Sequence, residues 1–551
     1  MRYAFLLFCL LTAAPGLLAQ KPDAPRPPLE PRQERRTELP LELYNSDVQV
    51  QPLAEDSSVV VLVEQDGRLT SRPTYYFQKL DYRLQPGPVQ LLEVPRGYEF
   101  QRICAEGTDV YALFSGLVEG TLWVAAFDTR TGELATGEFK TKRARQVHNL
   151  TALDGNLFVT VEVDQHLTVL LLNLQTAQFQ FLPSVYEPLP ARFTLVADSA
   201  TRRAELILSE TNGFKSRLQL KQLDQQGQLL RSEFVQAGSE RGLLDAQLSS
   251  GDSAARVLAG TYTLRDSRFS QGLFAADLTA GTTPTGQRRS LRFYDFLSFK
   301  HFFDFMKPAR VERLRQRQAR LRDVARQPRH RYQLLMHDMV PTANGFTLVA
   351  EVYYARYTGG SGSYGLPGNF GSLPYGLPTG FGYPSRYNSF YSNNSRRPPN
   401  GYHFSHAIVM GLDRQGNLLW DNSFLLEDIN RYQLEEVVAL RPMADGRLVL
   451  AYLKDDKFFY KIVDQTTPSP NDWQVRLRTN PAAAAPAETA RKNGEKGGEK
   501  GGEKGGEKTL STYQEHLLPW YGSHFLAVGY QSVRPESGRV RDVFFLNDLA
   551  F

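Results

Sequence analysis

A short turn signature that recurs at three distant places constrains the fold of this chain more than any other feature. In each copy an apolar residue leads into Asp, a polar turn closes on Gly, and Leu follows two residues later, at residues 127–134, 223–229 and 412–418. Gly supplies the positive φ that such a turn needs, and the Asp side chain accepts hydrogen bonds from the backbone that follows it. An aromatic residue ends each exit strand: Phe139, Phe234 and Phe424. Hairpins repeated through several hundred residues predict stacked four-stranded units, and a β-propeller is the leading arrangement.

Strand-like runs begin near residue 47 and continue to the end of the chain. Several, such as residues 59–63 and 448–453, are continuously apolar, which is typical of strands covered on both faces. We therefore expect an all-β fold, a single β-propeller of about seven four-stranded blades. The expected units lie near residues 47–95, 99–140, 146–183, 191–236, 243–298, 331–426 and 434–551. The last strand, residues 542–546, is expected to pair with early strands and to close the ring.

An outer-membrane β-barrel is the main competing fold. It is suggested by the terminal Phe551, with Leu549, Phe545 and Val543 on the same face of the last strand. Asn547 interrupts that face, and the strands lack the sustained alternation over ~10 residues that a lipid-facing strand needs. The propeller is therefore the preferred prediction.

The N-terminal segments predict export. Residues 1–19 have a positive start, an apolar run and a small-residue cleavage site, as in a signal peptide, and the run is shorter than the ~20 residues of a membrane span. Residues 20–40, rich in proline and alternating charge, are expected to be a disordered linker to the domain at 41–551. Without a later apolar segment, no transmembrane span is expected after signal removal. The mature protein is predicted to be periplasmic or extracellular, including a peripheral position at the outer membrane.

Three insertions interrupt the strand pattern. Residues 299–330 begin with a Phe-rich stretch, expected to pack as core or as a lid, and continue after Pro308 as an Arg-rich helix. Residues 358–400 form a low-complexity loop rich in Gly, Tyr and Pro, and residues 480–508 contain Gly-Gly-Glu-Lys repeats. We expect the last two to be disordered because they cannot bury enough apolar surface to offset chain entropy.

The charge pattern limits the classes of partner. The net charge of +5 over 551 residues is concentrated in the Arg-rich helix, which argues against a nucleic-acid partner. Arg313, Arg317 and Arg320 on that helix would suit acidic lipid, lipopolysaccharide or an acidic partner, although such a run also forms ordinary solvated faces. Tyr364 and Tyr375, in a repeated Tyr-Gly-Leu-Pro, would suit adaptable contacts with an envelope protein or glycan.

Catalytic signatures are absent from the sequence. There is no Gly-x-Ser-x-Gly elbow, Walker loop or dinucleotide fingerprint, so no cofactor is expected. The remaining acid–base candidates are His337, Asp338 and His406. His403 and His406 are three apart and are expected to face opposite sides of a strand, so no metal site is expected.

The chain shows two resemblances to known families. The turns at Asp128, Asp224 and Asp413 resemble those of pyrroloquinoline-quinone-type propeller repeats, although no matching cofactor-stacking or catalytic residues are present to carry over. Residues 332–338 and 419–424 resemble an uncharacterised exported bacterial family of β-propeller-like repeats. That resemblance implies export and β-rich repeats, and it implies no activity.

These observations lead to two functional hypotheses. The preferred one is a non-enzymatic binding or scaffolding protein of the bacterial cell envelope, because repeat folds present broad surfaces and long loops. The alternative is a propeller-type hydrolase or lyase acting on envelope polysaccharide, with His337, Asp338 and His406 in acid–base roles. Propellers host both classes, so the position of these side chains is what discriminates between them.

Overall fold

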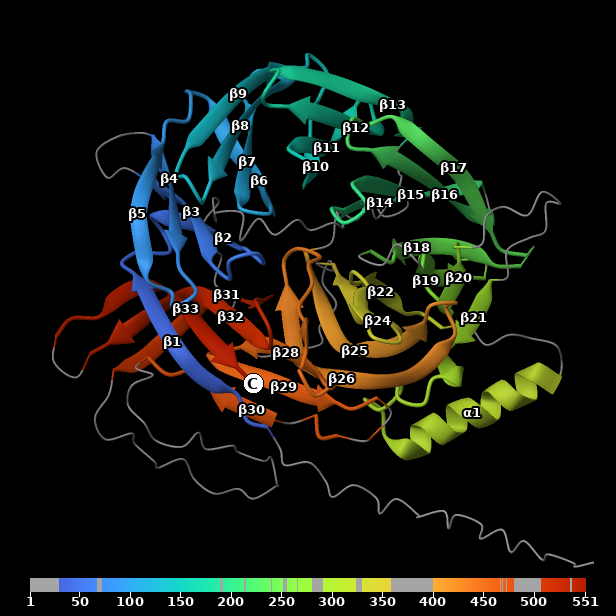
Figure 1. Ribbon diagram of the computed structural model, residues 1–551. Helices are drawn as coiled ribbons and strands as arrows, with labels where there is room; N and C mark the ends of the chain where they lie inside the picture. The colour runs from blue at the N-terminus through green and yellow to red at the C-terminus, as the bar shows by residue number, and fades with distance from the viewer. Residues whose placement is uncertain are drawn as a thin grey trace, which may run out of the picture.

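Eight antiparallel sheets are arranged around a central axis, as the ribbon in Figure 1 shows. The fold is a β-propeller. The competing prediction, a β-barrel, would require one closed sheet, whereas the described residues form eight separate sheets. The structure, a computed structural model, describes residues 29–66, 72–188, 192–212, 215–238, 240–250, 255–264, 266–279, 291–323, 330–357, 400–465, 467, 469–471, 473–479, 507–535 and 538–551.

The strands follow one another around the ring in chain order. The first half comprises β1 (Arg32–Leu39), β2 (Ser46–Pro52), β3 (Val59–Asp66), β4 (Pro73–Leu80), β5 (Pro86–Leu92), β6 (Tyr98–Glu106), β7 (Asp109–Gly116), β8 (Thr121–Asp128), β9 (Leu134–Lys140), β10 (Val147–Leu153), β11 (Asn156–Val163), β12 (His166–Asn173), β13 (Gln178–Pro188), β14 (Arg192–Asp198), β15 (Arg203–Asn212), β16 (Lys215–Asp224) and β17 (Leu229–Gln236). The second half comprises β18 (Gly242–Leu248), β19 (Val257–Thr263), β20 (Gly272–Asp277), β21 (Arg292–Asp295), the 3₁₀ turn η1 (Phe296–Ser298), the helix α1 (Pro308–Asp323), β22 (Gln333–Met336), β23 (Val340–Thr342), β24 (Gly345–Arg356), β25 (Gly401–Asp413), β26 (Leu418–Arg431), β27 (Ala439–Pro442), β28 (Leu448–Lys454), β29 (Lys457–Val463), β30 (Trp473–Arg476), β31 (Lys508–Pro519), β32 (His524–Arg534) and β33 (Arg541–Ala550).

Blades 1 to 5 are β2–β5, β6–β9, β10–β13, β14–β17 and β18–β21, each a four-stranded sheet in chain order. Blade 6 has five strands, because β22 and β23 both pair with β24, which is followed by β25 and β26. Blade 7 is β27–β30, and blade 8 combines β31, β32 and β33 with β1 from the start of the chain. The N-terminal strand β1 thus completes the last blade and closes the ring. This confirms the expectation that the last strand of the sequence pairs with an early strand, because β33 pairs with β1.

Each neighbouring pair of blades encloses its own hydrophobic cluster. There are eight such clusters of buried residues in the described part of the chain, including one shared by blades 8 and 1. In that last cluster Val48 and Val61 of blade 1 pack with Leu526 and Phe544 of blade 8. Burial on both faces explains the continuously apolar runs, since every sheet is covered by a neighbour on each side.

The expected count of about seven blades is one too low. The first six predicted units correspond to blades 1 to 6, but the last unit, residues 434–551, contains both blade 7 and the three C-terminal strands of blade 8. In the sequence, residues 480–506 separate β30 of blade 7 from β31 of blade 8, and they lie outside the described residues. The insertion with the Gly-Gly-Glu-Lys repeats therefore connects two blades and does not interrupt one. The blade boundary was missed because the fourth strand of blade 8 comes from the other end of the chain.

The linker prediction for residues 20–40 is wrong in its C-terminal part. Arg32–Leu39 forms β1 and pairs with β33 over its length. The strand could not be recognised by composition because it is the outermost of its blade and only Leu39 is fully buried. The predicted signal at 1–19 and most of the loops at 358–400 and 480–508 lie outside the described residues.

The three recurring turns have the predicted geometry. Each connects the last two strands of a blade: β8 to β9, β16 to β17, and β25 to β26. Asp128, Asp224 and Asp413 each accept two backbone N–H groups of the turn through Oδ1. The closing glycines have φ between +76° and +79°: Gly132, Gly227 and Gly416. The signature therefore marks the outer hairpin of blades 2, 4 and 6.

Replacing Gly132 by Ala should destabilise the protein by about 1–2 kcal/mol through backbone strain alone. No atom lies within 4 Å of the position that the new Cβ would occupy, so no steric clash is expected. Thermal unfolding of the Gly132→Ala variant would measure the effect. Gly238→Ala is a suitable control, because its Cβ would also meet nothing within 4 Å and Gly238 is not among the residues with positive φ. Equal midpoints for the two variants would contradict the explanation.

Candidate functional site

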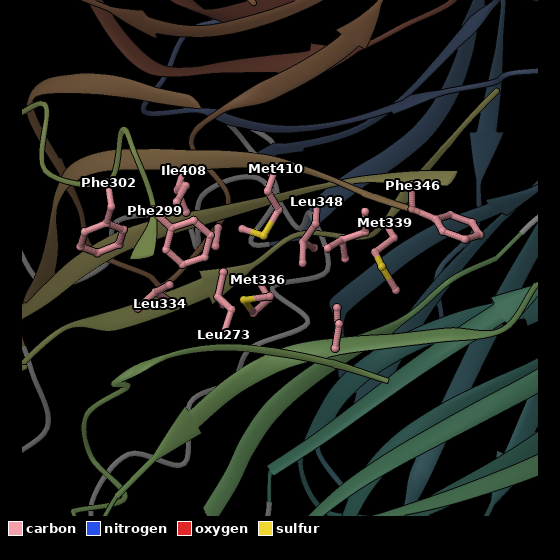
Figure 2. Close-up of a cluster of buried hydrophobic side chains, with 14 of the residues drawn as sticks. Leu273, Phe299, Phe302, Leu334, Met336, Met339, Phe346, Leu348, Ile408 and Met410 are labelled. Carbon is pink, nitrogen blue, oxygen red and sulfur yellow. The ribbon is translucent and has the colours of Figure 1, made fainter. Parts of the chain in front are cut away.

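The insertion between blades 5 and 6 is anchored by its Phe-rich stretch. Phe299, Phe302 and Phe303 are buried, and they pack in the cluster between these two blades. Figure 2 shows Phe299 and Phe302 beside Leu334 of β22 and Ile408 of β25. The stretch is therefore core, and it fixes the start of the helix that follows.

The helix α1 lies at the periphery of the ring (Figure 1) and begins at Pro308, as predicted. Its inner face packs through Val311 and Leu314, which are partly buried against the same cluster. The Gln318 side chain is also buried, and its Nε2 donates to Asp295 Oδ1 at 3.4 Å. Apolar packing on one side and a polar contact further along hold the helix in one orientation on the ring.

The outer face of α1 is strongly basic. Five arginines of the helix are exposed, namely Arg310, Arg313, Arg315, Arg317 and Arg320. Lys307, just before the helix, is exposed as well, and Glu312 is the one exposed acid on the described face. Two of these arginines, Arg310 and Arg313, border two adjoining hollows of about 330 Å³ and about 430 Å³. Phe305 and Met306 supply apolar lining to the first hollow, and Leu314 supplies it to the second.

The predicted binding residues have different outcomes. Arg313 and Arg317 line the second hollow, and Arg320 is exposed on the next turn of α1, so the structure brings these three onto one surface. Tyr364 and Tyr375 lie outside the described residues. Sequence reasoning did not single out Lys307 or Phe305, because their proximity to the arginines depends on the turn before Pro308.

His337 follows β22 and is buried in a cluster of carboxylates between blades 6 and 7. Its Nε2 lies 2.8 Å from Glu351 Oε1, and its Nδ1 lies 3.7 Å from Glu436 Oε2. Glu351, which is fully buried, also accepts the backbone N–H groups of Val437 and Val438, at 2.9 and 2.7 Å. The same carboxylate therefore pairs with His337 and holds the chain entering β27, the inner strand of the next blade.

The carboxylates around His337 favour its charged form. Burial alone would lower the pKa of His337, but the charge of Glu436 and the hydrogen bond and charge of Glu351 outweigh it. Asp338 adds a smaller effect in the same direction, and the pKa of His337 rises to about 9. Nearby, burial raises the pKa of Glu435 to about 7, although Arg431 lies 3.5 Å away. His337 is thus a charged partner in an ion pair at neutral pH.

His406 lies in a different environment on β25. Its ring stacks on Phe305 at 4.2 Å and meets the edge of Phe302, and its Nδ1 is 2.9 Å from the hydroxyl of Ser405. Burial lowers the pKa of His406 to about 3, so the ring is neutral. His406 belongs to the packing that anchors the insertion.

The structure does not bring His337 and His406 together. In the register of β24 with β25, Glu351 is opposite Ala407 and Val352 is opposite His406. Consecutive residues of a strand point to opposite faces, so His406 and the Glu351 that binds His337 lie on opposite faces of blade 6. These two histidines therefore do not lie in one common site, as the hydrolase or lyase hypothesis requires.

The expected orientation of His403 relative to His406 is wrong. A β-bulge falls between Phe404 and His406, and it places His403 opposite Tyr354 while His406 is opposite Val352. Tyr354 and Val352 share one face of their strand, so the two histidines do as well. Their contacts still differ, because His403 is near Asn430 Oδ1 at 3.3 Å and is partly exposed to solvent.

The His337 ion pair predicts a pH dependence. The folded pKa of about 9 exceeds the ordinary value of 6.5, so the stabilisation is complete below 6.5 and is lost as the pH rises through 9. The difference corresponds to about 3 kcal/mol. Thermal midpoints should fall across this window, and the fall should be smaller for His337→Gln. His403→Gln, which changes a partly exposed histidine, should show the same fall of the thermal midpoint with pH as the wild type. If His337→Gln showed that same fall, the His337 ion pair would not be its cause.

Comparisons with known proteins assign this chain to no family. No family model matches this chain, and no curated protein matches it. Solved structures similar to it include the polysaccharide lyase Uly1, at 9% identity and a TM-score of 0.36, covering 84% of this chain and 91% of that one. Prolyl oligopeptidase B from Galerina marginata has 8% identity and a TM-score of 0.38, covering 90% and 56%. The β-propeller domain of the Trilobed protease from Pyrococcus furiosus has 7% identity and a TM-score of 0.33, covering 78% and 98%. Likenesses this distant carry no argument about fold or activity, and the propeller rests on the sheets described above.

None of the helices among the described residues has the length and apolar character needed to cross a membrane.

Proposed function

We propose that this protein is an exported, non-enzymatic binding module of the bacterial cell envelope, and that the outer face of α1 attaches it to an anionic lipid surface. The observation that carries the proposal is the group of five exposed arginines on a helix that packs against the ring through Val311 and Leu314. The adjoining apolar lining from Phe305 and Met306 suits a ligand that combines negative charge with hydrocarbon. Anionic lipids have both properties, because a charged headgroup lies directly above the acyl chains at the membrane surface.

Electrostatics alone could supply useful affinity. Each Lys or Arg close to an anionic membrane contributes about 1 kcal/mol. The five arginines and Lys307 together would contribute on the order of 6 kcal/mol, equivalent to a partition enhancement of about 10⁴. Exposed charges are screened by salt, so this binding should weaken strongly as ionic strength rises.

The non-enzymatic part of the proposal is supported by the roles of the buried histidines. His337 pairs with Glu351 and Glu436, and its raised pKa keeps the ring protonated at neutral pH, so it has no free nitrogen with which to accept a proton. His406 is enclosed by Phe302 and Phe305, and its lowered pKa leaves the ring neutral, without the extra proton that a general acid must donate at neutral pH. Both side chains are accounted for by packing between blades.

Co-sedimentation with lipid vesicles tests the proposal. The full chain should bind vesicles that contain phosphatidylglycerol and should not bind vesicles of phosphatidylcholine alone. The triple variant Arg310→Ser, Arg313→Ser, Arg317→Ser should reduce binding at least tenfold. A matched control changes three exposed arginines elsewhere, Arg96→Ser, Arg130→Ser and Arg143→Ser, and loses the same net charge.

The two triple variants separate a local surface from a general charge effect. Equal losses of binding in both would mean that net charge, and not α1, determines attachment. Failure of the wild-type protein to bind anionic vesicles at low salt would reject the lipid ligand. Retained capture of an acidic envelope glycan or protein in that case would favour the scaffold hypothesis with a different partner.

A further inference from the structure

Ring closure brings together three potential metal ligands from distant parts of the chain. Glu34 of β1, His524 at the start of β32 and Asp548 of β33 each offer one ligand atom, and these atoms lie within 4.8 Å of one another. The pairing of β1 with β33 shifts register between Gln33 and Arg35, so Glu34 lies at a β-bulge. Bulges re-aim a side chain, and this one separates Glu34 from the regular ladder.

The Asp548 carboxylate is buried and only half satisfied. Its Oδ1 lies 2.7 Å from His524 Nδ1, whereas its Oδ2 has no hydrogen-bond partner although the residue is 0% exposed. Arg35 Nη1 lies 3.6 Å from this Oδ2, but it donates its hydrogen bond to the Tyr82 carbonyl, at 2.6 Å. A buried carboxylate oxygen without a donor is costly, and a cation would satisfy it.

The position of His524 is fixed from the opposite side. Its backbone N–H donates to the Tyr521 carbonyl at 2.8 Å, and its ring stacks on the Tyr521 ring with centroids 4.2 Å apart. The edge of the imidazole also faces Trp520. A rigid turn therefore presents the imidazole to the two carboxylates.

We propose that Glu34, His524 and Asp548 bind a divalent transition-metal ion of the zinc class, which links β1 to β32 and β33. One imidazole nitrogen with two carboxylate oxygens is a donor set used by Zn²⁺, with bonds of about 2.0–2.2 Å. Around a tetrahedral ion, bonds of this length place the donor atoms about 3.3–3.6 Å apart, so donor atoms that now lie up to 4.8 Å apart must move together by about 1 Å when the ion binds. The fourth position of a tetrahedral ion would be left to water.

Arg35 should set the strength of this site. Its guanidinium lies 3.6 Å from Asp548 and 3.8 Å from Glu34, so its positive charge opposes a second cation. Replacing Arg35 by Gln should therefore tighten metal binding, whereas an ordinary ion-pair network would simply be weakened by the same change. This opposite response distinguishes a metal site from a structural cluster.

Isothermal titration of the chelator-treated full chain with Zn²⁺ tests the proposal. We expect saturable binding of one ion per chain and a rise in the thermal midpoint on adding Zn²⁺. Binding should weaken at least tenfold in Glu34→Gln and in His524→Gln, should tighten in Arg35→Gln, and should be unchanged in His403→Gln. Glu34 is exposed, so Glu34→Gln is expected to fold even if the His524 variant does not.

Several results would overturn the metal site. They are the absence of saturable binding, an affinity that does not fall in Glu34→Gln, or an equal loss of affinity in His403→Gln, which would indicate unspecific binding by surface histidines. Vesicle binding should be unaffected by all of these variants, because α1 lies outside the ring between blades 5 and 6.

Discussion

A chain that begins at Leu41 should fail to form a stable ring, whereas a chain that begins at Leu29 should fold normally. The first lacks β1, which pairs with β33 from Arg32 opposite Ala550 to Leu39 opposite Phe544. Net stabilisation of about 1 kcal/mol per backbone hydrogen bond makes the loss several kcal/mol, a large part of a typical total stability. The β33 edge would also be exposed, and exposed edges promote aggregation.

Thermal unfolding and size-exclusion chromatography of the two truncated chains would measure this effect. Adding a synthetic peptide of residues 29–40 should restore the thermal midpoint of the shorter chain, because a peptide can add to an open sheet edge as a strand. A scrambled peptide of the same composition is the control. If the chain from Leu41 were as stable and monomeric as the chain from Leu29, β1 would not close the ring.

Replacing Arg256 by Met should destabilise the protein by about 3–5 kcal/mol, the usual cost of breaking a buried ion pair from one side. Arg256 lies just before β19 in blade 5, and its Nη2 contacts both oxygens of Glu205, at 3.0 and 2.9 Å. Its Nη1 contacts Glu233 at 2.8 Å, so one guanidinium binds two carboxylates of blade 4. Both glutamates are buried, and Glu205 would remain without its cation.

A double variant separates the uncompensated charge from the lost packing. Burial raises the pKa of Glu205, and the charge and hydrogen bonds of Arg256 oppose that rise, so the loss of Arg256 disfavours the charged carboxylate. Arg256→Met combined with Glu205→Gln should therefore be more stable than Arg256→Met alone. Arg130→Met, at an exposed arginine 3.8 Å from Asp128, should change stability by about 0.5 kcal/mol or less. Thermal midpoints that show no rescue in the double variant would contradict the assigned role.

The sequence was informative wherever the structure depends on local interactions. The turns at Asp128, Asp224 and Asp413 were predicted because the side chain, the glycine and the backbone that they join lie within a few residues. The helix after Pro308 was predicted for the same reason, and its exposed arginines follow from its helical periodicity. The inward packing of Phe299 was also anticipated from its apolar context.

The features that were missed depend on partners remote in sequence. The strand at Arg32–Leu39 is mostly polar, and only its pairing with residues 541–550 makes it part of the fold. The pairing of His337 with Glu351 depends on the register of two strands, and the contact of Glu351 with Val437 depends on the packing of two blades. The cluster of Glu34, His524 and Asp548 exists only because the two ends of the chain meet.

The most direct test of the proposed function is hydrogen–deuterium exchange of the full chain with anionic and with neutral vesicles. We predict that exchange at residues 308–323 slows in the presence of anionic vesicles and is unchanged with neutral ones, while the strands of blades 2 to 4 are unaffected. Addition of salt should abolish the protection, since the contacts are made by exposed charges. If the protein binds anionic vesicles and residues 308–323 show no added protection, the lipid-binding surface is not α1.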